Sequence, residues 1–180
     1  IQKIRDRADG TPRLSLFLLA GSQFGAYAAT FAIYWASTAL VEQVTHSSGQ
    51  LGLMFFLTML PTLLFGLISG VFVDRFHRVK MLILGGIIRT VIALLFAPYM
   101  ARFFERSAVG LWGVYATNFG LFLIMQFALP AEHSLLPCIA SQAQLLAANS
   151  VIPGITLLSQ GAGLLILGPT LLQWGDASLV

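Results

Sequence analysis

The sequence predicts an all-α membrane protein on the basis of its composition, the placement of its charges and the length of its apolar segments. Of the 180 residues, 57% are hydrophobic and only 9% are charged, and the mean hydropathy is +0.85. Soluble globular chains carry about 25% charged residues, so this chain lacks the polar residues needed to coat a water-facing surface. The charged residues gather in short stretches between long apolar segments. Such segments reach the roughly 20 apolar residues that a helix needs to cross a bilayer.

Five segments have this length, and they cover residues 14–41, 51–73, 81–101, 110–129 and 144–173. The first is too long for the apolar core of a signal peptide, so it is expected to be the first transmembrane helix. Ser47 and Gln50 fit a capping box before the second segment. The links are short except for 130–143, which contains Pro130 and Pro137.

The basic residues set the expected orientation, because cytoplasmic loops of membrane proteins carry an excess of Lys and Arg. Seven basic residues share a side with the N-terminus against two on the other side: Lys3, Arg5, Arg7, Arg13, Arg75, Arg78 and Lys80 against Arg102 and Arg106. Residues 1–13 are therefore expected to be a cytoplasmic N-terminal segment, 14–173 transmembrane helices 1–5, and 174–180 the start of an external link. With five helices, the chain is expected to be a fragment of a longer protein.

The remaining composition argues against two other classes of protein. The net charge is +3, but the basic residues sit at helix ends without interleaved aromatic residues, so no nucleic-acid partner is expected. The single cysteine, Cys138, excludes an internal disulfide and a CxxC metal site. The spans contain no metal-ligand cluster and no phosphate-binding loop. Glu132 and His133 are adjacent on a helix and point about 100° apart, which disfavours an acid–base pair. No enzymatic activity and no cofactor are expected.

A short charged link at residues 74–80 separates the second and third segments, which are expected to form a tight hairpin. Its basic residues are explained by orientation alone, but Asp74, four residues after Gly70, is not. An aspartate at this boundary can accept hydrogen bonds from the N-terminus of another helix or pair with an arginine. Because such a contact is breakable, we expect it to act as a latch that holds one conformation.

The link resembles the loop signature between helices two and three of the major facilitator superfamily, on the residues Gly70, Asp74, Arg75 and Arg78. His77 and Val79 depart from that signature, and the departure at His77 is common in the drug- and macrolide-efflux-like branch. A second stretch resembles the link between helices four and five of the same branch, on Pro130, Ala131, Pro137 and Asn149. Gly168 and Pro169 resemble a fifth-helix antiporter motif.

The resemblance implies a major facilitator-type helical bundle of which about five helices of the N-terminal half are present. It implies a secondary active transporter in the bacterial cytoplasmic membrane, a permease that exports small amphipathic or hydrophobic compounds by alternating access. Its partners would be the lipid bilayer, a small-molecule substrate and the C-terminal half of the same transporter. Two alternatives are a lysophospholipid transporter or flippase of the same superfamily, and a non-transporting membrane scaffold or sensor with this fold.

Arg89 is the one charge well inside a span, roughly 12 Å beyond Met81 at 1.5 Å per residue. Intramembrane charges usually face a bundle interior or an aqueous cavity. Arg89 is therefore either a structural partner of a carboxylate or of carbonyls, or an anion contact or part of a coupling network. Glu42, Glu105, Glu132 and Asp176 are expected at helix ends or links, which leaves no carboxylate near the middle of a span to couple transport to protons.

Further polar and aromatic groups at membrane depth are possible cavity residues: Gln23, Tyr27 and Tyr34 in the first helix, and Asn118 and Gln126 in the fourth. Hydrogen bonds between helices explain each of them equally well. An apolar cavity with a few amides and aromatic rings would suit amphipathic or lipid-like molecules better than sugars.

Small residues recur along three helices and predict close helix-on-helix packing. In the fifth helix they are spaced by seven: Ala147, Gly154, Gly161, Gly168 and Gly175. The first helix has Gly21, Gly25, Ala28, Ala32 and Ala36, and the second has Gly66 and Gly70. Helices that slide or rock during transport would use the same smooth faces.

Overall fold

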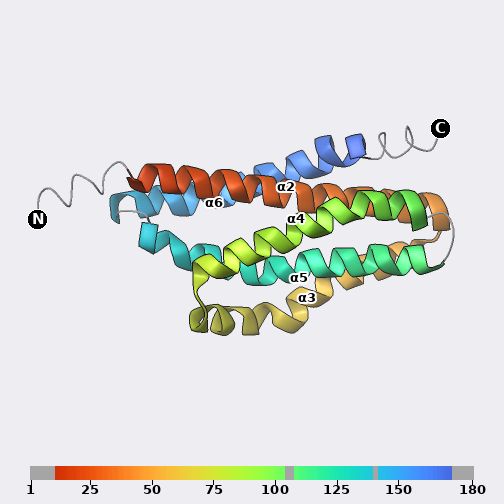
Figure 1. Ribbon diagram of the computed structural model, residues 1–180, viewed down its shortest axis with the longest axis horizontal. Coiled ribbons are helices and arrows are strands. Elements are labelled where there is room, and N and C mark those ends of the chain that lie inside the picture. Colours follow the sequence, from red (N-terminus) through yellow and green to blue (C-terminus); the bar gives the residue numbers. More distant parts are fainter. Residues whose placement is uncertain (1–10, 104–107, 140–141, 172–180) are drawn as a thin grey trace, which may run out of the picture.

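In the computed structural model, the described residues are 11–103, 108–139 and 142–171, with side chains for 17–73, 75–96, 110–135 and 149–171. They form the helices α2 (Thr11–Thr45), α3 (Ser48–Arg75), α4 (Arg78–Phe103), α5 (Ala108–Ile139) and α6 (Gln142–Ala162). A π-helical turn, η1 (Gly163–Leu167), continues α6, and the helix ends at residue 171 (Figure 1). No strand occurs among these residues. Residues 1–10 of the expected N-terminal segment 1–13 and the expected link 174–180 lie outside them, and residues 11–13 belong to α2.

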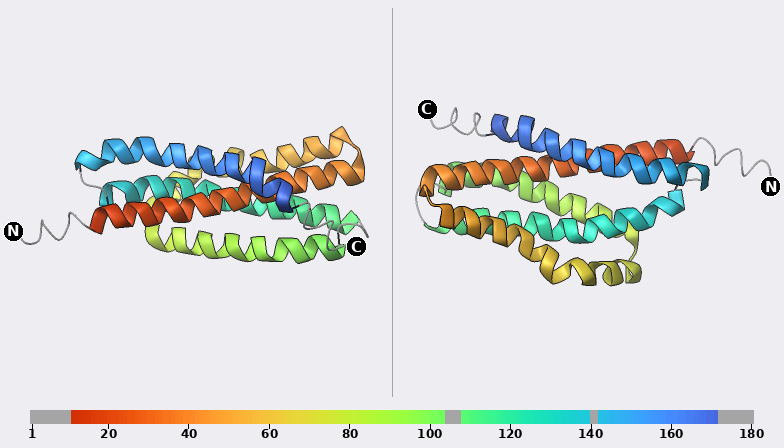
Figure 2. Two further views of the ribbon diagram at one scale, coloured as in Figure 1. Left: turned by 90° about the horizontal axis from the view of Figure 1, so that it is seen from above. Right: turned by 180° about the vertical axis from the view of Figure 1, so that it is seen from behind.

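The prediction of five membrane-length helices is confirmed. The apolar stretches run over Phe17–Thr45, Ser48–Val73, Arg78–Phe96, Gly110–Leu135 and Asn149–Leu171. Each is long and apolar enough to cross a bilayer, and the helices lie roughly along one direction (Figure 2). The chain is therefore all-helical over its described part and has the spans of a membrane protein.

Unlike a water-soluble protein, the bundle exposes many of its largest apolar side chains and buries several polar ones. Polar side chains are buried inside it: Gln23, Thr30, Ser37, Thr58, Ser69, Arg89, Asn118, Glu132 and Ser159. Large apolar side chains lie outside, and Leu67 is 93% exposed. Since lipid tails accept apolar side chains but not polar ones, this arrangement fits a bilayer environment.

Helices α2 and α5 form the centre of the bundle, because each of them contacts all four other helices. Phe127 of α5 packs against Phe65 and Phe72 of α3, with ring centroids 6.0 and 5.6 Å apart. Helices α3 and α4 both lie on α5 and barely touch each other. The expected tight hairpin is therefore wrong: packing on α5 holds the two helices apart despite their short link.

The expected long link at 130–143 is also wrong, because α5 continues through Pro130 to Ile139. Proline removes one backbone donor, and membrane helices tolerate this loss when neighbouring helices or side chains satisfy the freed groups. The face that follows Pro130 is packed inside the bundle, where Ala131 and Glu132 are buried. Tertiary packing thus extends the helix beyond the point where the sequence pattern predicts its end.

The connection between α2 and α3 consists of His46 and Ser47. His46 takes a left-handed conformation (φ 45°), and its N–H donates to the carbonyl of Glu42 (3.0 Å), which ends α2. Ser47 is the N-cap of α3 as expected, but its side chain makes no capping bond. Gln50 Oε1 instead accepts a hydrogen bond from Tyr115 Oη of α5 (2.7 Å), so the predicted capping box is replaced by a bond between helices.

The glycines that pack closely against another helix match the expected small-residue stripes only in part. A Cβ at Gly163 would collide with the carbonyl oxygen of Ala28 and lie 3.1 Å from the nitrogen of Ala32, and one at Gly168 would lie 3.0 Å from Trp35. Ala28 and Ala32 of α2 therefore lie against η1. Six other glycines of the stripes make no such contact with described residues, since a Cβ there meets no atom closer than 4.0 Å: Gly21, Gly25, Gly66, Gly70, Gly154 and Gly161.

Candidate functional site

Three polar side chains from three helices meet inside the bundle. Tyr27 of α2 donates its hydroxyl to Glu132 Oε2 of α5 (3.2 Å). The guanidinium carbon of Arg89 of α4 lies 5.4 Å from the centre of the Tyr27 ring, within the range of a cation–π contact. Tyr27 therefore stands between one positive and one negative group.

Glu132 corrects the sequence-based expectation that every carboxylate lies at a helix end or link. It is only 1% exposed and belongs to the continuous helix α5. Pro130 predicts the end of a helix, but α5 continues past it to Ile139. Glu132 is the residue that sequence reasoning missed at this site. Ala128 and Ala131 are also buried and lie on the same inward face of α5. Their small size, close to Glu132 in the sequence, is the pattern that could have indicated this face.

Two buried polar atoms of the cluster lack hydrogen-bond partners. Arg89 Nε and Glu132 Oε1 are buried without a hydrogen-bond partner, and no ion pair joins the two side chains. Buried polar atoms are nearly always paired, because leaving one unpaired costs about 1–3 kcal/mol. Such a departure in a native structure commonly belongs to a site that binds something or moves.

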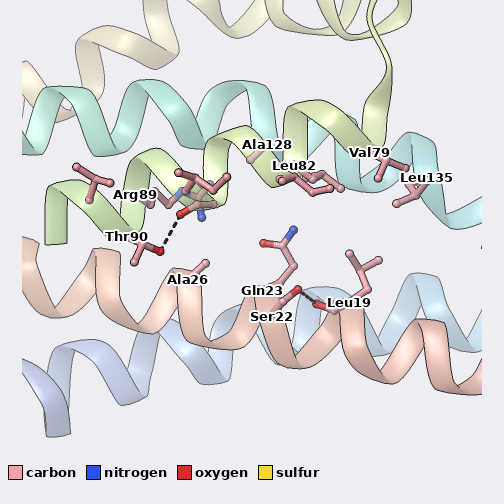
Figure 3. A pocket seen from close by; sticks show the side chains of 14 residues that line it. Leu19, Ser22, Gln23, Ala26, Val79, Leu82, Arg89, Thr90, Ala128 and Leu135 are labelled. Atoms are coloured by element: carbon pink, nitrogen blue, oxygen red, sulfur yellow. Dashed lines mark hydrogen bonds between the residues drawn. The ribbon is translucent and has the colours of Figure 1, made fainter. Parts of the chain in front are cut away.

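A cavity of about 550 Å³ lies beside the cluster, between α2, α4 and α5 (Figure 3). Its wall is mostly apolar and has four polar lining residues: Ser22, Gln23, Arg89 and Thr90. The two hydroxyls donate within their own helices, Ser22 to the carbonyl of Leu19 (2.8 Å) and Thr90 to that of Gly86 (2.9 Å). Gln23 and Arg89 are left as the polar groups available to a molecule in the cavity.

Two of the expected cavity residues instead join helices. Asn118 donates to Ser37 Oγ of α2 (2.9 Å), and Gln126 donates to Thr62 Oγ1 of α3 (2.7 Å). Neither lines the cavity. Tyr34 packs edge-on against Phe55 and Phe122, which is an aromatic contact between helices. For these three residues the structural reading is the better one.

The bond between Asn118 and Ser37 provides a test of this reading. In a double-mutant cycle with Asn118→Ala and Ser37→Ala, we expect a coupling energy of about 0.6 kcal/mol, the average for such bonds in membrane proteins. Unfolding of the purified variants in mixed micelles measures it. Zero coupling would contradict a bond between these side chains.

The two link motifs meet at one end of the bundle. Arg78 Nη1, at the start of α4, donates to the carbonyl of Ser134 in α5 (2.8 Å). Arg75 is exposed, and Gly70 is half-buried. In the second motif Pro130 is half-buried, Ala131 buried and Asn149 exposed. The side chains of Asp74 and Pro137 lie outside the described set. The structure thus brings together Arg78 and the second motif, which are far apart in sequence.

Comparison with known proteins adds no assignment: no protein-family model, no curated protein and no solved structure matches the chain. Among the described residues, no group of three or more His, Cys, Asp or Glu side chains is arranged to hold a metal ion. The features of the molecule that bear on its function are the spans, the buried cluster and the cavity.

Proposed function

We propose that the chain is the N-terminal part of a major facilitator-type transporter that exports small amphipathic compounds across a bacterial cytoplasmic membrane. The observation that carries the proposal is the cavity between three membrane-length helices, with a buried cation and an amide in a mostly apolar wall. Secondary transporters bind their substrates near the bilayer midplane between helices, and buried intramembrane charges mark substrate or ion pathways.

The charged link adds support from a different part of the chain. The resemblance to the superfamily signature rests on Gly70, Asp74, Arg75 and Arg78, and Arg78 bonds to the backbone of α5. A contact of this kind between the link and a neighbouring helix can form in one conformation and break in another. It would favour one state of the transporter by a few kcal/mol, the range that separates such states in general.

The direct test is transport by the reconstituted full-length transporter, of which this chain is the proposed N-terminal part. Proteoliposomes loaded with amphipathic dyes, macrolides and lysophospholipids, in separate experiments, would report which class is moved. Export of the dyes or macrolides supports the proposal, whereas movement of lysophospholipids alone would favour the flippase alternative. Folded protein that moves none of them would favour a scaffold or sensor.

Replacing Asp74 tests the latch. We expect Asp74→Ala to reduce the transport rate about tenfold or more, since about 1.4 kcal/mol of lost preference corresponds to a factor of ten. Membrane insertion and yield should stay near wild type. Glu42→Ala, which removes an exposed carboxylate at the end of α2, is the matched control and should transport normally. If Asp74→Ala loses folded protein in proportion to transport, the residue is structural.

A further inference from the structure

We infer that the cavity between α2, α4 and α5 binds the anionic headgroup of an amphipathic molecule, with Arg89 and Gln23 as the headgroup contacts. The consequence for transport rests on the proposed function, but the binding itself does not. A substrate of this kind is anionic at one end and apolar at the other. Neither the helical spans nor the link motif specifies these two properties.

Arg89 supplies the positive charge. It is 6% exposed, lines the cavity, and keeps Nε without a hydrogen-bond partner. Its guanidinium carbon lies over the Tyr27 ring, 5.4 Å from the ring centre. A guanidinium presents its N–H groups as a planar fork, which matches a carboxylate or a phosphate with two parallel bonds.

Gln23 supplies a neutral donor from the opposite wall. It is 8% exposed, makes no hydrogen bond with the described residues and extends from α2 into the space facing α4 (Figure 3). An amide that has no partner among the described residues can give its hydrogen bond to a ligand, and such a bond contributes about 0.5–1.5 kcal/mol net. Arg89 on α4 and Gln23 on α2 thus offer donors to the same volume.

The rest of the wall fits an apolar chain. Leu19, Leu82, Ile83, Ile87 and Leu135 line the cavity, whose volume of about 550 Å³ exceeds what a headgroup alone would fill. Ligand sites of roughly 300–1,000 Å³ with mostly apolar walls and a few placed polar groups are typical of small-molecule binding. Ile83 and Ile87 are more than half exposed, so a longer chain can extend past them.

Glu132 acts as the resident counter-charge of Arg89. Its carboxylate accepts from Tyr27, and it is not among the residues that line the cavity. Because it does not bond to Arg89 directly, the guanidinium is available to an anion without breaking an ion pair. Its negative charge nevertheless opposes the incoming anion, and Glu132→Gln should tighten anion binding several-fold.

The test is binding to the full chain in nanodiscs of zwitterionic phosphatidylcholine. Three probes are compared: a fluorescent fatty acid, a fluorescent lysophosphatidic acid and a cationic amphipathic dye. We expect both anionic probes to bind at least about tenfold more tightly than the cation, a preference of about 1.4 kcal/mol. Comparing the affinities of the two anionic probes shows whether the site prefers a carboxylate or a phosphate headgroup. Inorganic phosphate should compete weakly, because it lacks the chain. Equal or tighter binding of the cationic dye would overturn the inference.

Variants locate the site. Arg89→Gln should weaken anion binding roughly 10- to 100-fold, as expected for loss of hydrogen bonds to a charged group. Arg89→Lys should lose less, and Gln23→Leu several-fold. Lys80→Gln removes an exposed charge from the same helix and should bind like wild type. Unchanged binding by folded Arg89→Gln would overturn the assignment. If that variant does not fold, Gln23→Leu with unchanged binding would do so.

The two proposals fail separately. If the folded protein transports cationic dyes and does not bind anions, the proposed transport function is supported and the anion site is contradicted. If the protein binds the anions but transports no probe, the anion site is supported and the proposed function is contradicted.

Discussion

Replacing Gly163 with alanine is expected to destabilise the bundle by about 1–3 kcal/mol, the usual cost of forcing extra atoms into a packed interior, and valine should cost more. The added Cβ would collide with the carbonyl oxygen of Ala28 and approach Phe31 and the nitrogen of Ala32. The obstacle is mainly backbone, which cannot move aside as a flexible side chain can. Thermal unfolding of the purified variant in micelles measures the effect.

Gly161 provides the matched control for this change. It lies two residues earlier on the same helix, and a Cβ there meets no described atom within 4 Å. Gly161→Ala should therefore be tolerated, or stabilise the helix by up to about 1 kcal/mol through its higher propensity. Equal destabilisation of both variants would mean that the close approach of η1 to α2 is not the cause.

The second large effect is expected at the buried cluster. Glu132→Leu leaves Arg89 buried without its counter-charge and the hydroxyl of Tyr27 without its acceptor. Leaving a buried polar group without its partner costs about 1–3 kcal/mol, and more where a charge is involved, so we expect the free energy of unfolding to fall by about 3 kcal/mol. Denaturant unfolding in mixed micelles measures it.

A triple variant separates the charge effect from packing. Replacing the whole cluster (Tyr27→Phe, Arg89→Leu and Glu132→Leu) removes every buried polar atom at once, and should restore stability to near wild type or above. The same variant should no longer bind the anionic amphipath. If the triple variant is as unstable as Glu132→Leu alone, lost packing and not an uncompensated charge is the cause.

The number and approximate places of the helices were predictable because a bilayer imposes a length and an apolar composition on each span. All five predicted segments fall within or largely within helices of the structure. Arg89 was also predictable as an interior charge, since no water-facing position exists in the middle of a span. These features depend on local sequence and on the solvent, not on which helices are neighbours.

The partners of Arg89 were not predictable in this way. Glu132 follows Pro130, and the local pattern there favours the end of a helix. Only packing on the neighbouring helices carries α5 onward and turns Glu132 inward toward Tyr27. The same reason explains the glycines. A seven-residue repeat selects Gly161 and Gly168, whereas the position of α2 determines that Gly163 is the contact with the least space.

By itself the sequence determined that this protein is helical, that it has five membrane-length spans, and that the residues of its charged link and one buried arginine require explanation. Only the tertiary structure decided which polar groups share a site. Gln23 and Arg89 face one cavity, while Asn118 and Gln126 join helices. The physical reason is that the free energy of transferring a segment into lipid depends only on the residues of that segment. The site, in contrast, depends on how α2, α4 and α5 pack against one another.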